Sequence, residues 1–196
     1  MKVIGITGGV GAGKSTVLDY LSEHHHAYVI QADKAGHLVM EPNGLCYDQI
    51  VDLFGKQILK QDKTIDRKIV SDIVFENKAM RQRLEAIVHP AVKKYILNKI
   101  EEQKSTGCRL LIVEAALLLE DHYDAFCDAV WYIHTDSEIR IQRLIDSRGY
   151  SRQKAENIIA SQASEMFFRN HSDRTITNNG HLEETWQQIE EGIKLL

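Results

Sequence analysis

The segment Gly8-Gly9-Val10-Gly11-Ala12-Gly13-Lys14-Ser15 follows the apolar run Val3–Ile6. It fits the pattern G-x-x-x-x-G-K-[ST], and a position between a short buried strand and a helix is the context in which this pattern binds nucleotides. Glycines let the backbone turn inward so that several N–H groups point at one phosphate chain, and the positive end of the helix dipole adds to the attraction. This segment, called the phosphate loop below, predicts binding of a nucleoside triphosphate.

The phosphate loop also assigns roles to single residues. Lys14 is expected to reach the β- and γ-phosphates, and Ser15 is expected to ligate Mg²⁺. A glycine-rich turn with an incidental lysine is the alternative, but eight positions in register between strand and helix argue against it. The residues expected to contact the nucleotide here are Gly9, Val10, Gly11, Ala12, Gly13, Lys14, Ser15 and Thr16.

Composition sets limits on the rest of the chain. With 196 residues, of which 43% are hydrophobic, it is long enough for one sizeable core. The net charge of -4 argues against nucleic-acid binding. Cys46, Cys108 and Cys127 are irregularly spaced, as expected of reduced thiols inside a cell. Because no long apolar stretch suggests a signal peptide or membrane span, we expect a soluble cytoplasmic protein that binds no membrane.

Apolar runs alternate with helical patterns along the chain. Such alternation predicts an α/β fold with a parallel sheet, helices on both faces, and ligands at the carboxyl ends of the strands. Between about Gly36 and Glu102 no convincing strand occurs, and apolar residues recur at helical spacing, which predicts a helical insertion. The expected strands are Val3–Ile6, Ala27–Ile30, Leu110–Val113, Ala129–Ile133 and, more weakly, Thr175–Thr177.

Asp33 is the leading candidate for a catalytic acid–base group. It lies just beyond the strand Ala27–Ile30, and therefore at the same sheet edge as the phosphate loop. A carboxylate there can accept the proton of an attacking hydroxyl or bind Mg²⁺ through water. Alternatively, Asp33 caps a helix that begins near Lys34, since aspartate is a favoured N-cap residue. Position alone does not separate these two roles.

Three arginines lie on a predicted helix at 138–148. At 100° per residue, Arg140, Arg143 and Arg148 span an arc of about 140°, and Leu144 lies inside it, so this is not a purely solvated face. Arginine can neutralise charge on a transferring phosphoryl group with its planar donor fork, and Arg143 and Arg148 are the candidates for that role. Surface pairing with nearby carboxylates is the alternative.

Two further polar residues stand out in helical surroundings. Gln162 falls on the apolar face of a helix predicted from Ser151 to about Arg169, where its amide must bond backbone or a ligand. His89 precedes Pro90, which favours non-helical geometry and a break between two helices. A histidine at such a break can contact a substrate, or can merely cap a helix end.

The motifs occur in a characteristic order: the phosphate loop, Ala32-Asp33-Lys34, His89-Pro90, Leu117-Leu118-Leu119-Glu120, Arg143-Leu144 with Arg148, Gln162 and Asn178-Asn179-Gly180. This set closely resembles the dephospho-CoA kinase family, and the likeness runs from Met1 to the final helix. The resemblance implies ATP-dependent transfer of the γ-phosphoryl group to the ribose 3′-hydroxyl of dephospho-CoA, the last step of coenzyme A synthesis.

The resemblance also implies how the chain is organised. Asp33 becomes the general base, Lys14, Arg143 and Arg148 the other catalytic residues, and His89 a substrate contact. Asn178, otherwise a turn residue, lies beside the ATP adenine. A nucleotide-binding core is expected from 1–35, 103–136 and 170–196, an acceptor-binding insertion from 36–102 and a lid from 137–169. We expect a monomer or a weak homo-oligomer.

The sequence departs from the family pattern at several places. Gln31 stands where an acidic residue is common, Ala116 where a proline is usual, and Lys93 with Lys94 near a position that often holds arginine. A bidentate anion contact is therefore not assigned to that last position. Glu114 follows a strand and has the position of a second Mg²⁺-associated acid, on which the family varies.

Other functions compete with a small-molecule kinase. A regulatory GTPase is suggested by Asp33-Lys34-Ala35-Gly36, which fits D-x-x-G, and by Asn98-Lys99-Ile100-Glu101, which nearly fits N-K-x-D, but neither has the required structural context. A non-catalytic ATP-binding module and a nucleoside monophosphate kinase are the further alternatives. The run His24–His26 is expected on the surface, because three consecutive helical residues cannot all face one metal ion.

Overall fold

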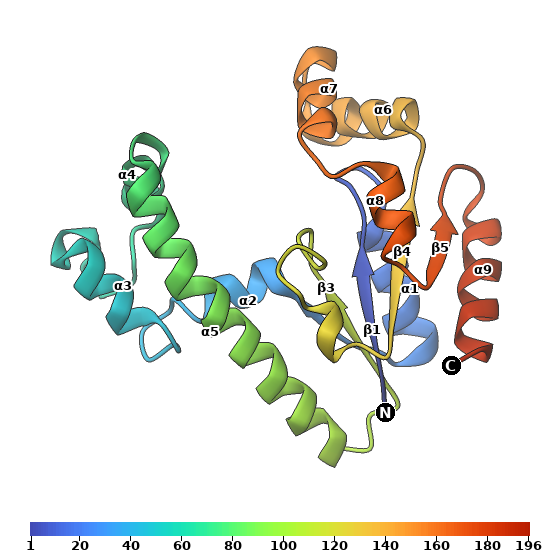
Figure 1. Cartoon of the computed structure of the whole chain (residues 1–196), viewed down its shortest axis with the longest axis horizontal. Coiled ribbons are helices and arrows are strands. Elements are labelled where there is room, and N and C mark those ends of the chain that lie inside the picture. The colour runs from blue at the N-terminus through green and yellow to red at the C-terminus, as the bar shows by residue number, and fades with distance from the viewer. The chain divides into compact units, whose positions relative to one another are not determined.

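The computed structural model describes all 196 residues. They form two compact units, one made of residues 1–29 and 103–196 and the other of residues 30–102. The elements of both units are labelled in Figure 1. The strands are β1 Lys2–Thr7, β2 Tyr28–Gln31, β3 Leu110–Glu114, β4 Ala129–His134 and β5 Arg174–Thr177.

The five strands form one sheet in the order β2-β3-β1-β4-β5. β1 pairs in parallel with β3 and with β4, and β4 pairs in parallel with β5. All five residues of β3 are buried, which explains why this strand is a continuous apolar run ending in Glu114. The predicted α/β class and all five expected strands are confirmed. Because β1 is central, the phosphate loop begins in the middle of the sheet edge.

Helices cover both faces of the sheet. The helices, in chain order, are α1 Lys14–His25, α2 Ala32–Leu38, α3 Tyr47–Phe54, α4 Arg67–Glu76, α5 Lys78–Ser105, α6 Ser137–Arg148, α7 Arg152–Ala160, α8 Glu165–Asn170 and α9 Leu182–Lys194. On one face, Trp131 and Ile133 of β4 join a buried cluster with residues of α1 and α9. On the other face, the ring of Tyr132 stacks on Phe168 of α8 with 5.0 Å between centroids.

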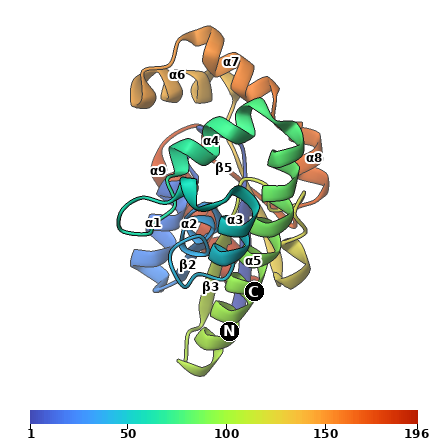
Figure 2. The same ribbon diagram turned by 90° about the vertical axis from the view of Figure 1, so that its left-hand side faces the viewer.

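The helices α6 and α7 form a hairpin beyond the carboxyl ends of the strands in both ribbon views (Figures 1 and 2). Gly149 ends α6 in the left-handed conformation, which closes the turn between the two helices. Their shared core consists of Ile141, Leu144 and Ala155, and Val10 of the phosphate loop packs against it. The hairpin is thus in side-chain contact with the loop it lies above.

The helix expected from Ser151 to about Arg169 is divided in the structure. α7 ends at Ala160 and α8 begins at Glu165, so Gln162 lies in the turn between them instead of on a helical face. Ser164 is the N-cap of α8, because its hydroxyl accepts a hydrogen bond from the Phe167 N–H. This cap favours the start of a new helix over the continuation of α7. Within α8, Met166 is 71% exposed, whereas Phe168 is buried.

The unit of residues 30–102 is helical. It contains α2, α3, α4 and most of α5. Leu59 and Ile65 form an isolated antiparallel β-bridge within it. The expected break at His89-Pro90 is wrong, because both residues lie inside the continuous helix α5. Pro90 removes one backbone donor, but Val92 and Ile96, which follow it, are buried, and this packing outweighs the local cost.

The three cysteines are free. Burial raises the pKa of the Cys46 thiol to about 11 and that of Cys127 to about 12, which keeps both thiols protonated near neutral pH. Cys108 is partly exposed. We therefore expect iodoacetamide at pH 8 to alkylate Cys108 first in the folded protein, as checked by peptide mass mapping. Faster labelling of Cys46 or Cys127 in the native state would contradict this expectation.

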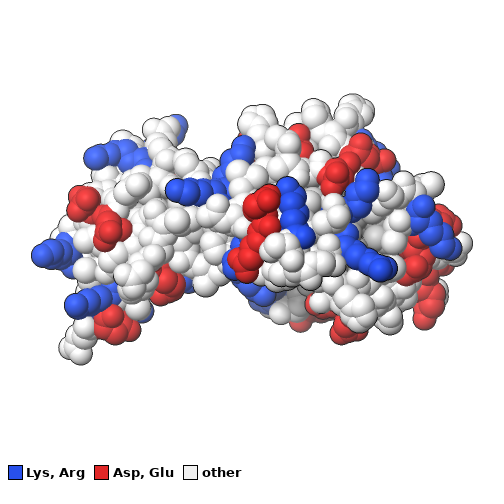
Figure 3. All heavy atoms as spheres, turned by 90° about the horizontal axis from the view of Figure 1, so that it is seen from below, with Lys and Arg blue, Asp and Glu red and all other residues white.

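Basic and acidic side chains are interspersed on the face drawn in Figure 3. That face carries no continuous basic surface of the kind that binds a nucleic-acid backbone. No helix in the structure combines the length and the apolar character needed for a bilayer span.

Candidate active site

The phosphate loop connects β1 to α1 and is shaped by glycines. Gly8, Gly11 and Gly13 all have positive φ, with Gly13 at 84° in the cap position of α1. A Cβ added to Gly8 would lie 2.6 Å from the carbonyl oxygen of Ile133 in β4. The loop therefore needs glycine both for its conformation and for its close approach to the neighbouring strand.

Lys14 is held between the loop and β3. Its Nζ donates to the carbonyl oxygen of Gly8 at 2.9 Å and lies 3.6 Å from Oε1 of Glu114. The side chains of Lys14 and Glu114 are only 15% and 10% exposed. An ammonium and a carboxylate so poorly solvated attract each other more strongly than a surface pair, so the position of Nζ is well defined. Sequence position suggested Glu114 as a site acid, and the structure puts it beside Lys14.

Asn178 fixes the opposite side of the loop. It follows β5 and is 2% exposed. Its side-chain Nδ2 donates to the carbonyl oxygen of Ala12 at 2.9 Å, and its Oδ1 accepts from the hydroxyl of Thr185. A Cβ on Gly13 would overlap this amide. In this structure the Asn178 side chain therefore supports the loop, and its expected contact with adenine stays a prediction.

Arg143 joins the loop to the turn after β5. Its guanidinium donates to the carbonyl oxygen of Asn178 at 2.9 Å and to that of Ala12 at 3.4 Å. Thr135, the residue after β4, donates from its hydroxyl to the same Ala12 carbonyl oxygen at 3.0 Å. Because Arg143 belongs to α6, a cation of the hairpin lies directly against the phosphate loop.

The comparisons with known proteins agree with this geometry. The family model described as dephospho-CoA kinase matches residues 2–184. The chain belongs to the dephospho-CoA kinase family. A dephospho-CoA kinase from Symbiobacterium thermophilum is 37% identical over 190 residues, covering 97% of this chain and 79% of that protein. The chain is thus a kinase, and the resemblance seen in the sequence is confirmed.

Solved structures confirm the fold. A dephospho-CoA kinase from Campylobacter jejuni superposes with a TM-score of 0.74 at 27% identity, covering 99% of this chain and 96% of that one. A crystal structure of a protein from Thermus thermophilus gives a TM-score of 0.81 at 24% identity, covering 100% and 97% of the two chains. The parallel sheet with its phosphate loop is therefore the P-loop kinase fold.

Asp33 belongs to the unit of residues 30–102 and occupies the first turn of α2. The helix begins at Ala32 with Gln31 in the cap position, so the alternative that Asp33 is an N-cap is wrong. Its side chain is exposed and thus accessible to a bound molecule. The carboxylate still interacts favourably with the helix dipole, so a structural contribution of about 0.3 to 1 kcal/mol accompanies any catalytic role.

The remaining expected site residues have different surroundings. Arg148 is exposed at the C-terminal end of α6, and His89 is exposed within α5. The run His24–His26 ends α1, and Nε2 of His25 lies 2.7 Å from Glu190 of α9. No group of histidine, cysteine and acidic side chains forms a metal site in the structure.

Sequence reasoning did not select Arg140, yet this side chain lies against the loop. Its Nε donates to the carbonyl oxygen of Val10 at 2.8 Å. Burial lowers the pKa of the Arg140 guanidinium from its ordinary value. The arc of about 140° that holds the three arginines contains Arg140 as well as Arg143, so the sequence indicated the helical face of Arg140. It did not show that the phosphate loop lies against that face.

Thr7 supplies a prediction about stability. Its Oγ1 is buried at the end of β1 and has no hydrogen-bond partner. We expect Thr7→Val to leave the free energy of unfolding unchanged or to raise it by up to about 1 kcal/mol, because no hydrogen bond is lost. Urea denaturation measures this value.

Thr135→Val is the matched control. Thr135 is equally buried, but its hydroxyl donates towards the carbonyl oxygens of Ala12 and Asn178. Removing that hydroxyl should lower the free energy of unfolding by about 0.5 to 1.5 kcal/mol, because a buried hydrogen bond is lost while both carbonyl oxygens still accept from Arg143. Equal losses in both variants would mean that the Thr7 hydroxyl does have a partner in solution.

Proposed function

We propose that this chain transfers the γ-phosphoryl group of ATP to the ribose 3′-hydroxyl of dephospho-CoA, giving coenzyme A and ADP. The observation that carries the proposal is Lys14, seated between Gly8 and Glu114 at the centre of the sheet edge in a member of the dephospho-CoA kinase family. An ammonium in this position attracts the outer phosphates and lowers the repulsion that an attacking oxygen meets.

Mg²⁺ fits the oxygen groups near Lys14. The hydroxyl of Ser15 is exposed in the first turn of α1, and the carboxylate of Glu114 lies beside Lys14. Hydroxyl and carboxylate oxygens are the hard ligands that Mg²⁺ prefers, with triphosphate oxygens and water completing its shell. Ser15 would hold the ion directly, and Glu114 would act near it. The ion, when bound, neutralises charge on the triphosphate.

Asp33 is the proposed general base, and the unit of residues 30–102 is the proposed acceptor-binding part. Support comes from its exposed carboxylate, which lies two residues after the end of β2. As the 3′-oxygen attacks the terminal phosphorus, its proton is transferred to the carboxylate of Asp33. His89, exposed on α5 of the same unit, is the proposed second contact with the acceptor.

Residues 137–169 are the proposed lid. Arg143 touches the phosphate loop already, and Arg148 is exposed at the end of the same helix. Both are proposed to face the phosphates when the hairpin closes, and the turn at Asn178 is proposed to lie beside adenine. We further propose a cytoplasmic protein that acts as a monomer or weak homo-oligomer and binds no nucleic acid; its free cysteines and mixed surface charge support this setting.

The test is incubation with ATP, Mg²⁺ and dephospho-CoA, followed by mass spectrometry of the small molecules. We expect dephospho-CoA to gain one phosphate while ATP becomes ADP, and coenzyme A, whose 3′-oxygen is already phosphorylated, to remain unchanged. Parallel reactions with AMP, CMP and UMP test the nucleoside monophosphate alternative, and GTP in place of ATP tests the GTPase alternative. Phosphorylation of a monophosphate in preference to dephospho-CoA, or strict dependence on GTP, would overturn the proposal.

A further inference from the structure

Gln162 and Arg140 form hydrogen bonds with the N–H and the carbonyl group of Val10 in the phosphate loop. The Val10 N–H donates to Oε1 of Gln162 at 3.1 Å, and the Val10 carbonyl accepts from Nε of Arg140 at 2.8 Å. Nη2 of Arg140 donates to the same Gln162 oxygen at 2.5 Å. One carboxamide oxygen thus serves as the acceptor for a loop amide and for a guanidinium at once.

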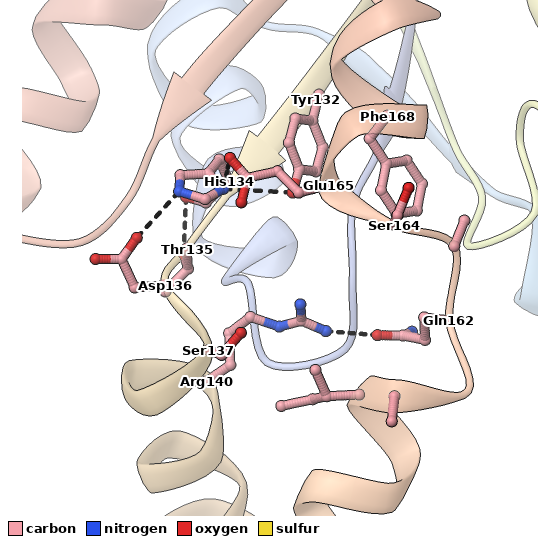
Figure 4. Close-up of a pocket in the computed structure, with 13 residues that line it drawn as sticks. Tyr132, His134, Thr135, Asp136, Ser137, Arg140, Gln162, Ser164, Glu165 and Phe168 are labelled. Atoms are coloured by element: carbon pink, nitrogen blue, oxygen red, sulfur yellow. Dashed lines mark hydrogen bonds and ion pairs between the residues drawn. The ribbon is translucent and has the colours of Figure 1, made fainter.

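This arrangement lies on the loop itself. A Cβ added to Gly9 would overlap the guanidinium of Arg140, so the cation rests directly over that glycine. Both Arg140 and Gln162 are half-buried, and they line a cavity of about 500 Å³ beside β4, α6 and α8. Figure 4 shows the guanidinium of Arg140 pointing to the Gln162 amide, with the rings of Tyr132 and Phe168 above them in this view.

Such a set of donors is complementary to a phosphate oxygen. Amide N–H groups of a phosphate loop normally donate to the phosphates of the nucleotide, and a guanidinium adds a charged donor with fixed geometry. In this structure the Val10 N–H and the Arg140 guanidinium both donate to the neutral carboxamide oxygen of Gln162. A phosphate oxygen in that place would carry negative charge and bind both donors more strongly than the amide does.

We propose that Oε1 of Gln162 occupies the position of an oxygen of the terminal phosphate, and that Arg140 is a catalytic residue that contacts this phosphate once ATP displaces Gln162. Val10 lies on the strand side of the loop, ahead of Gly13 and the helix whose amides face the inner phosphates, which favours the terminal group. This inference rests on ATP as the phosphoryl donor and gives Arg140 a role beside Arg143 and Arg148.

The test compares two nucleotides in the absence of any acceptor. Isothermal titration calorimetry with Mg²⁺ measures binding of ADP and of the non-hydrolysable triphosphate AMP-PNP. For Arg140→Met we expect AMP-PNP binding to weaken by about tenfold or more, because a charged hydrogen bond to the terminal phosphate is lost, while ADP binding changes by less than about threefold. Arg140→Lys, which keeps the charge without the fork, should recover part of the loss.

Gln162→Ala should act in the opposite direction. It removes the internal competitor for the Val10 N–H, so AMP-PNP binding should tighten by about three- to tenfold, with ADP binding unchanged. Arg152→Met is the control for a lid arginine, because Arg152 pairs with Glu138 and Glu156 on the exposed side of α7. It should leave both affinities as they are. Thermal unfolding of each variant checks that the fold persists.

The outcomes separate this inference from the proposed function. Equal weakening of ADP and AMP-PNP in Arg140→Met, or no weakening of either, would show that Arg140 only supports the loop and would overturn the inference. If Gln162→Ala bound AMP-PNP more weakly, Gln162 would be a support for the loop and not a competitor of the phosphate, which would also overturn the inference. Since no acceptor is present, a failure of dephospho-CoA to be phosphorylated would leave these binding results unaffected.

Discussion

Replacing Lys14 with alanine is expected to lower the turnover of dephospho-CoA by at least about a hundredfold and to weaken ATP binding. The Nζ atom is fixed by Gly8 O and by Glu114, so it provides positive charge at one defined point of the phosphate loop. That charge is needed both when the triphosphate binds and when charge shifts onto the leaving phosphate oxygens. Steady-state kinetics and calorimetric titration with ATP measure the two losses.

Lys2→Ala is the matched control for this variant. Lys2 begins the same strand, β1, but its exposed side chain lies at the end opposite to the loop. Its removal should leave turnover and ATP affinity unchanged within about twofold, as for surface substitutions generally. If Lys14→Ala retained wild-type turnover and ATP affinity, the assignment of residues 8–15 as a phosphate-binding loop would be wrong.

The second large effect is expected at Asp33. Asp33→Asn keeps the shape of the side chain but removes its ability to accept a proton, so turnover should fall by about 10² to 10⁴. ATP affinity should stay nearly intact, because the substitution leaves the phosphate loop unchanged. Because Asp33 is exposed in the first turn of α2, the free energy of unfolding should change by less than about 1 kcal/mol.

Asp48→Asn separates a catalytic carboxylate from one that only stabilises a helix. Asp48 is exposed in the first turn of α3, in the same unit and at the same helical position as Asp33. Both variants should lose the same small stability contribution from the helix dipole. Only Asp33→Asn should lose turnover; unchanged turnover in that variant would remove Asp33 from the role of base.

Much of the fold could be predicted because its signals are local. A parallel strand buried on both faces must be apolar throughout, which made β1, β3 and β4 visible as continuous runs. The glycines of the phosphate loop were equally clear, since positive φ at Gly11 and Gly13 excludes most other residues. Family membership followed from the order of such motifs along the chain.

Helix boundaries were harder to predict because packing and capping compete. Pro90 predicted a break, yet buried neighbours in α5 keep the helix continuous. The periodicity around Gln162 predicted an unbroken helix, yet the Ser164 cap starts a new one. The N-cap of α2 is Gln31 and not Asp33, a difference of two residues that local propensity does not resolve.

The sequence by itself determined the parallel sheet, the phosphate loop and the lysine within it, because each depends on residues adjacent in the chain. The tertiary structure decided which groups meet that loop: Glu114 from β3, Asn178 after β5, and Arg140 with Gln162 from the hairpin and the turn that follows it. These contacts join residues more than a hundred positions apart in several cases, as for Val10 and Gln162. Helical phase gives the face of a side chain, but only packing between elements fixes what that face touches.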